Sequence, residues 1–259
     1  MAFETPSPTA KLSIQSLSKN YVIDQKALRV LLNIDLDVHE GEFVSIVGRS
    51  GCGKSTLLRL VSGLENDYSG TIQLDGKVIN APSLDRGMIF QDPSLLPWMT
   101  VRENVAFALV NQNIPKAEKD KRVLDLIDLV GLKGFESAYP KELSGGMAQR
   151  AAIARALVSQ PKVLLLDEPL GALDALTRLR LQNELQRIWL QHRMTMIMVT
   201  HDVEEAVYLG DRVVIMDPEP GRIRRIVDVP LPHPRDRASP VLHAIRDEVL
   251  KDLTNGVVI

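Results

Sequence analysis

Residues 43–56 read FVSIVGRSGCGKST. The apolar run 43–47 is typical of a short buried strand, and the pattern STLLRLVSG at 55–63 is typical of a helix that ends at Gly63. The glycine-rich residues between them match the spacing GxxxxGK[ST]. Strand, glycine-rich loop and helix in this order predict an α/β fold with a phosphate-binding loop at its centre.

The loop chemistry explains this residue pattern. Glycines allow backbone N–H groups to turn towards anionic oxygens, and the helix N-terminus adds partial positive charge. Lys54 can reach the β- and γ-phosphates, and the Ser55 hydroxyl can join the shell of a Mg²⁺ ion. The predicted nucleotide-binding residues of the loop are Gly48, Arg49, Ser50, Gly51, Cys52, Gly53, Lys54, Ser55 and Thr56.

A second strand supplies carboxylates. Residues 163–168 read VLLLDE, so Asp167 and Glu168 follow four apolar residues at a strand end, where parallel sheets bind ligands. One carboxylate can serve the metal, and the other can orient and deprotonate an attacking water. Our hypothesis gives the metal role to Asp167 and the role of catalytic base to Glu168.

A further glycine pair opens a helix pattern elsewhere in the chain. Residues 143–150 read LSGGMAQR, which predicts a second anion-binding helix N-terminus. One nucleotide does not need two such ends. Two chains that each complete the other's site would use both.

At this point the chain resembles the ATP-binding subunit of an ABC transporter. The similarity spans nearly the whole chain and rests on motifs in the family's order: 48–56, Gln91, 143–150, 163–168, GALD at 171–174 and THD at 200–202. It implies a P-loop NTPase (RecA-like) α/β core with an N-terminal antiparallel β subdomain and an inserted α-helical subdomain. It also implies ATP and Mg²⁺ as ligands.

The resemblance implies roles for further residues. Tyr21 matches the aromatic that stacks on adenine, and Gln91 matches the residue that contacts Mg²⁺ and the water and links to the membrane subunit. His201 matches the histidine on the γ-phosphate. The residues implied to act across a homodimer are Ser144, Gly145, Gly146 and Asp174. Small departures from the family pattern, GALD for SALD and SGGMAQR for SGGQQQR, remove no phosphate-contacting group.

The predicted organisation rests on the change from strand patterns to helical patterns and back along the chain. We predict one nucleotide-binding domain over 1–259, in which 1–92 and 159–240 form the β subdomain and the RecA-like core, 93–158 the helical insertion and 241–259 a terminal helix. The predicted strands include 12–17, 71–74, 77–79, 163–167, 194–200 and 212–217, with a hairpin at Asp75-Gly76. The predicted helices include 101–110, 117–130, 145–158 and 175–191. The Pro-rich segment 217–240 is predicted to be a loop or linker.

The partners and location are implied rather than read directly. No apolar stretch approaches the roughly 20 residues that cross a bilayer, and the first residues lack the pattern of a signal peptide. LLPW (95–98), together with EEAVYLGDRVVIM (204–216) and PEPGRI (218–223), resembles the nitrate, sulfonate and taurine group. This resemblance implies two transmembrane permease subunits and, indirectly, a periplasmic substrate-binding protein. We expect a peripheral protein on the cytoplasmic face of the bacterial inner membrane that energises uptake of a small anion.

Composition limits the alternatives. With 31 basic and 33 acidic residues among 259, the net charge of −2 argues against nucleic-acid binding, and the single cysteine excludes a disulfide framework. An exporter ATPase or a soluble ABC ATPase not coupled to transport remains open at this stage. A GTPase is disfavoured because no NKxD-type tetrapeptide is present, and a small-molecule kinase because of LSGGMAQR.

Overall fold

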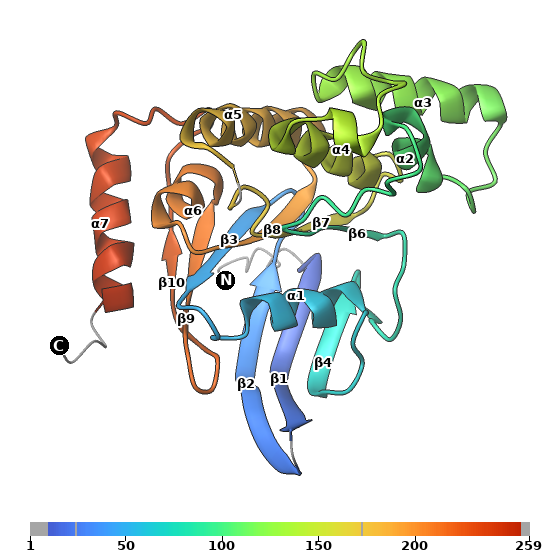
Figure 1. Cartoon of the computed structure of the whole chain (residues 1–259). Helices are drawn as coiled ribbons and strands as arrows, with labels where there is room; N and C mark the ends of the chain where they lie inside the picture. Colours follow the sequence, from blue (N-terminus) through green and yellow to red (C-terminus); the bar gives the residue numbers. More distant parts are fainter. Residues whose placement is uncertain (1–9, 24, 172, 255–259) are drawn as a thin grey trace, which may run out of the picture.

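A computed structural model of the chain describes residues 10–23, 25–171 and 173–254 (Figure 1). The strands are β1 (Leu12–Ile23), β2 (Lys26–Val38), β3 (Phe43–Gly48), β4 (Ser69–Leu74), β5 (Lys77–Val78), β6 (Arg86–Ile89), β7 (Val163–Asp167), β8 (Thr195–Thr200), β9 (Arg212–Asp217) and β10 (Arg222–Asp228). The helices are α1 (Lys54–Ser62), α2 (Val101–Phe107), α3 (Lys116–Leu129), α4 (Gly145–Leu157), α5 (Ala175–His192), α6 (Val203–Leu209) and α7 (Pro240–Thr254). The predicted α/β class is confirmed.

The larger sheet places the carboxyl ends of three strands together. Its order is β10-β9-β3-β8-β7-β6. The pairs from β9 to β6 are parallel, while β10 runs antiparallel to β9. The ends of β3, β8 and β7 therefore lie side by side on one edge, with β8 in the middle. Ligands of parallel sheets bind at this edge.

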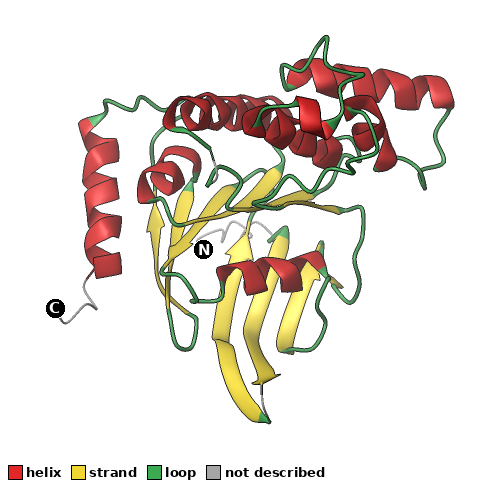
Figure 2. Cartoon of the chain, in the orientation of Figure 1, coloured by secondary structure: helices red, strands yellow, loops and turns green. Residues whose placement is uncertain are grey.

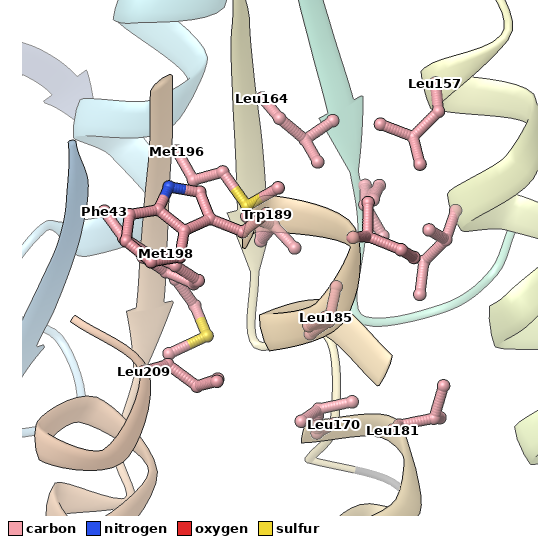
Figure 3. Close-up of a cluster of buried hydrophobic side chains, with 14 of the residues drawn as sticks. Phe43, Leu157, Leu164, Leu170, Leu181, Leu185, Trp189, Met196, Met198 and Leu209 are labelled. Atoms are coloured by element: carbon pink, nitrogen blue, oxygen red, sulfur yellow. The ribbon is translucent and has the colours of Figure 1, made fainter. Parts of the chain in front are cut away.

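Successive side chains of a strand point to opposite faces of the sheet. Both faces of this sheet are buried, each in its own hydrophobic core. Phe43 of β3 packs with Met198 of β8 and Trp189 of α5 in the core on one face (Figure 3). Val44 and Ile46 point to the other face and join a second core. The continuous apolar strands in the sequence are explained by this double burial.

The second core lies between the two sheets. The smaller sheet has the order β2-β1-β4-β5, and its apolar side chains share a cluster with those of α1 and the larger sheet. Figure 2 shows α1 lying across this antiparallel sheet. The β4–β5 hairpin turns at Asp75-Gly76, where φ is +50° and +72°, so the predicted two-residue turn is confirmed.

The prediction of a loop or linker over 217–240 is wrong in part. Residues 222–228 form β10, which pairs with β9 from Arg222↔Asp217 to Asp228↔Arg212. This edge strand buries Val227, while its three arginines are exposed, so it lacks the apolar signal of the central strands. The terminal helix predicted over 241–259 is present as α7, which begins at Pro240 and ends at Thr254, and residues 255–259 lie outside the described residues.

The helices α2, α3 and α4 pack against one another beside one end of α5 (Figure 1). Thr100 caps α2 through a capping box with Glu103, and the Ser144 side chain caps α4. These helices confirm the helical patterns in the sequence, whereas the domain boundaries remain predictions. Across the described residues, every helix is too short or too polar to cross a bilayer.

Candidate nucleotide site

The phosphate loop joins β3 to α1 at the carboxyl edge of the sheet. Gly51 and Gly53 take φ values of +81° and +91°, a conformation that favours glycine. A side chain at Gly53 would also come within 2.5 Å of Leu31 Cδ2. The loop conformation thus depends on glycine at this position for two reasons.

The Lys54 ammonium is held over the loop. Its Nζ donates to Gly48 O at 2.8 Å and to Arg49 O at 3.3 Å, and the residue is 6% exposed. A pocket of about 370 Å³ opens beside it. Its lining residues are Val30, Ser50, Gly51, Gly53, Lys54, Ser55, Thr56, Glu168 and His201.

Two oxygen donors meet at the start of α1. Ser55 Oγ donates to Asp167 Oδ1 at 2.8 Å, across 112 positions of sequence. Burial raises the pKa of Asp167, and the neighbouring Glu168 acts in the same direction, while the Ser55 hydrogen bond opposes both. A hydroxyl and a carboxylate are hard oxygen donors of the kind that Mg²⁺ prefers, so these residues fit the predicted metal.

Glu168 lies directly after β7 in a constrained backbone conformation. Its φ is +47°, which is uncommon for a residue with a side chain, and its N–H donates to Val199 O at 2.9 Å. Its Oε2 lies 3.1 Å from Nδ1 of His201, which follows β8. Adjacent strands thus bring the predicted base and the predicted histidine together at the pocket.

Gln91 follows β6 at the same edge of the sheet. Its Nε2 and Glu168 Oε2 lie 3.5 and 3.6 Å from the point that a side-chain carbon on Gly171 would occupy. The amide and the carboxylate therefore share the space above Gly171. The predicted third member of the catalytic group therefore lies near Glu168.

Tyr21 lies on β1, close to α1. Its hydroxyl donates to Glu65 Oε2 at 2.5 Å, and the Lys19 ammonium lies 4.6 Å from the ring centroid. Burial raises the pKa of Tyr21, and the Glu65 hydrogen bond raises it further. The ring is held in a fixed position on the antiparallel sheet.

The second predicted anion-binding end lies elsewhere on the chain. Ser144 Oγ accepts from Met147 N at 3.3 Å, and a side chain at Gly146 would lie 2.4 Å from Thr177 Cγ2. Ser144 and Gly146 line a different pocket, between α3, α4 and α5. Asp174 caps α5 by accepting from Thr177 N at 3.0 Å. Among the described residues, the chain does not fold these groups onto its own phosphate loop.

Sequence reasoning missed a buried acid four residues after His201. Glu205 is 3% exposed and accepts a hydrogen bond from the Thr200 hydroxyl. Burial raises the pKa of Glu205 to about 7, although the Thr200 hydrogen bond acts in the opposite direction. The spacing of Asp202 and Glu205, three residues apart at a helix start, was the available signal.

The raised pKa of Glu205 predicts that the free energy of unfolding depends on pH. Between its ordinary pKa of 4.5 and about 7 the folded chain holds a proton that the unfolded chain releases, so stability falls as pH rises. The loss approaches about 3 kcal/mol. In Glu205→Gln, stability relative to wild type should rise between pH 5 and pH 8, as measured by urea unfolding. Glu204→Gln, on the exposed neighbour, is the control, and parallel curves for Glu205→Gln and wild type would contradict the prediction.

A glycine-rich loop between a central parallel strand and a helix, with a serine hydroxyl on the carboxylate of another strand, defines a P-loop nucleotide-binding protein. Comparison with known families is more specific: the model described as "ABC transporter" matches residues 31–171. The chain belongs to the ABC transporter family.

Similar proteins share nearly the whole chain. The aliphatic sulfonates import ATP-binding protein of Bacillus subtilis is 47% identical over 241 residues, which is 93% of each protein. The bicarbonate transport ATP-binding protein of a Synechocystis strain is 44% identical and covers 98% of this chain and 94% of its own length. A solved dimeric, post-hydrolysis ATP-binding cassette with ADP and phosphate bound superposes with a TM-score of 0.75 at 32% identity, covering 84% of this chain and 98% of the cassette.

Proposed function

We propose that the chain is the ATP-hydrolysing subunit of an ABC importer that takes up a small anion such as a sulfonate, taurine or nitrate. The observation that carries the proposal is the pocket where the phosphate loop meets Glu168 and His201. The names of the similar proteins, which concern sulfonate and bicarbonate transport, support import of a small anion.

The loop residues act first, in binding. Backbone N–H groups of 48–56 and the Lys54 ammonium grip the phosphates, and Tyr21 stacks on the adenine. Ser55, Asp167 and Gln91 would hold Mg²⁺. When bound, this ion neutralises charge on the β- and γ-phosphate oxygens.

Glu168 then supplies the chemistry. Its carboxylate orients a water and takes a proton from it as the water attacks the γ-phosphorus in line with the bond to ADP. That bond breaks, and ADP and phosphate leave. His201 contacts the γ-phosphate and keeps the Glu168 carboxylate in place through the 3.1 Å contact.

A second copy completes each site. Ser144, Gly145 and Gly146 of one copy would contact the γ-phosphate held by the other, and Asp174 would cross the same interface. The separation of the two pockets within one chain supports this arrangement, as does the dimeric state of the similar cassette. Closure then depends on ATP because its γ-phosphate joins the two copies.

The membrane partners would dock beside the helical insertion. Trp98 is 69% exposed, and Leu95 packs partly against the core beneath it. An exposed tryptophan on a supported loop suits an interface with a hydrophobic partner. We propose two permease subunits there, on the cytoplasmic face of the membrane, which a periplasmic binding protein would supply with substrate.

This docking is testable with one variant. A tagged copy purified from its own membranes in mild detergent should carry an integral membrane protein, identified by mass spectrometry. Trp98→Ala should reduce its recovery at least roughly 10-fold, since a tryptophan that becomes buried at an interface is a frequent binding hot spot. Val78→Ala, on an exposed valine of β5, is the control. Full recovery with Trp98→Ala would remove Trp98 from the interface.

A further inference from the structure

The first turns of α5 carry polar side chains on one face. Asp174, Arg178 and Gln182 follow one another at intervals of four residues, which places them on the same side of the helix. Asp174 caps the helix, and Gln182 is buried. The proposed function uses Asp174 and leaves Arg178 without a role.

The Arg178 guanidinium joins two segments of the chain. Its Nη2 donates to Leu173 O at 3.1 Å, and its Nη1 lies 3.7 Å from Asp202 Oδ2. Its Nε is buried and has no hydrogen-bond partner among the described residues. One side chain therefore connects the residue before Asp174 with the residue after His201.

Asp202, at the other end of this connection, is held by hydrogen bonds of its own. Asp202 Oδ1 accepts from the backbone N–H groups of Glu204 and Glu205 at 2.9 and 3.2 Å. The Asp202 N–H donates to Thr200 Oγ1 at 3.1 Å. Both chain neighbours of His201 are thus fixed, while the His201 side chain is 62% exposed. Because Asp202 follows His201 directly in the chain, a shift of the Asp202 backbone would be passed on to the His201 backbone.

We propose that Arg178 is a positioning residue that ties the Leu173–Asp174 segment to the His201 segment of the same chain. This inference rests on the proposed function, because it assumes that Asp174 meets a second copy and that His201 serves hydrolysis. Contact across the dimer at Asp174 then sets the distance between His201 and Glu168. In each copy, contact at the dimer interface thereby changes the position of that copy's own His201 relative to Glu168.

The planar guanidinium is required for this connection. Arginine can donate to the Leu173 carbonyl and face the Asp202 carboxylate at the same time, whereas a lysine ammonium reaches one of them. Arg178→Lys should therefore retain part of the effect, and Arg178→Met should remove it. Arg246→Met, on a partly buried arginine of α7 whose side-chain exposure of 31% is close to the 34% of Arg178, is the matched control.

The first experiment detects a change in the position of the His201 imidazole. In the full chain with ¹⁵N-labelled histidine, the His201 imidazole signals are assigned by their loss in His201→Ala. Arg178→Met should shift these signals, Arg178→Lys should shift them less, and Arg246→Met should leave them unchanged. Unshifted His201 signals in Arg178→Met would overturn the proposal.

The second experiment measures how the Arg178 substitution changes the rate of ATP hydrolysis. Arg178→Met should lower kcat about 10- to 100-fold, as expected for a misplaced catalytic group, with ATP affinity unchanged. In the His201→Ala background the same substitution should have no further effect, because it acts through His201. An equal loss in that background would overturn the proposal.

The two proposals fail differently. Normal turnover of His201→Ala would remove His201 from the proposed mechanism, and the imidazole shift would then still decide the role of Arg178. Loss of turnover in His201→Ala together with unshifted signals in Arg178→Met would leave the proposed function in place and reject the link.

Discussion

Replacing Glu168 with glutamine should lower ATP turnover by about 10²–10⁴-fold, or roughly 3–5 kcal/mol of barrier, because a general base contributes that much. Glutamine has nearly the same shape but cannot accept the proton of the attacking water. ATP binding should persist because the phosphate loop and Ser55 are unchanged. Phosphate release measures turnover, and equilibrium titration measures binding.

The same variant should accumulate closed dimers. Hydrolysis removes the γ-phosphate that joins the copies, so a chain that binds ATP without cleaving it should remain paired in light scattering. Glu118→Gln, on an exposed acid of α3, is the control. A near-normal rate of phosphate release from Glu168→Gln in the assembled complex would show that another group deprotonates the water.

Replacing Ser144 with arginine should stop turnover altogether in a homodimer. The large cationic side chain would stand where the second copy brings its γ-phosphate, so that the interface could not close. Ser144→Ala is the comparison variant: it loses the helix cap, which contributes about 1 kcal/mol to stability, and the proposed γ-phosphate contact, but it places no bulky cation in the interface, so its loss of turnover should be smaller. Turnover and ATP-dependent dimerisation are the measurements.

Mixed dimers can distinguish the two sites. Glu168→Gln in one copy leaves a single live site, on the other copy. Ser144→Arg should silence that site when it lies on the Glu168→Gln copy, which faces the live phosphate loop. It should do less harm when it lies on the live copy itself. The reverse result would mean that each copy encloses its own nucleotide.

Sequence patterns were sufficient where one segment satisfies its own requirements. The apolar runs of β3, β7 and β9 and the glycine at the end of α1 identified those elements, because burial and backbone conformation act locally there. β10 was missed because an edge strand with three exposed arginines derives its hydrogen bonds from β9 and not from its own pattern.

The Arg178 link was missed for a related reason. Arg178 and Asp202 are ordinary polar residues in sequence, and only the packing of α5 beside α6, which Asp202 caps, makes them partners. Glu205 likewise has no distinguishing sequence pattern, and its raised pKa comes from its burial in the folded chain. Such contacts carry no periodic signal.

The sequence alone was enough to identify the phosphate loop, the two carboxylates after β7 and the glycine-led start of α4, because each depends on a few consecutive residues. The tertiary structure alone decided which groups meet: Ser55 reaches Asp167, and His201 reaches Glu168. The physical reason is the strand order β3-β8-β7, which brings the carboxyl ends of strands distant in sequence to one edge of the sheet.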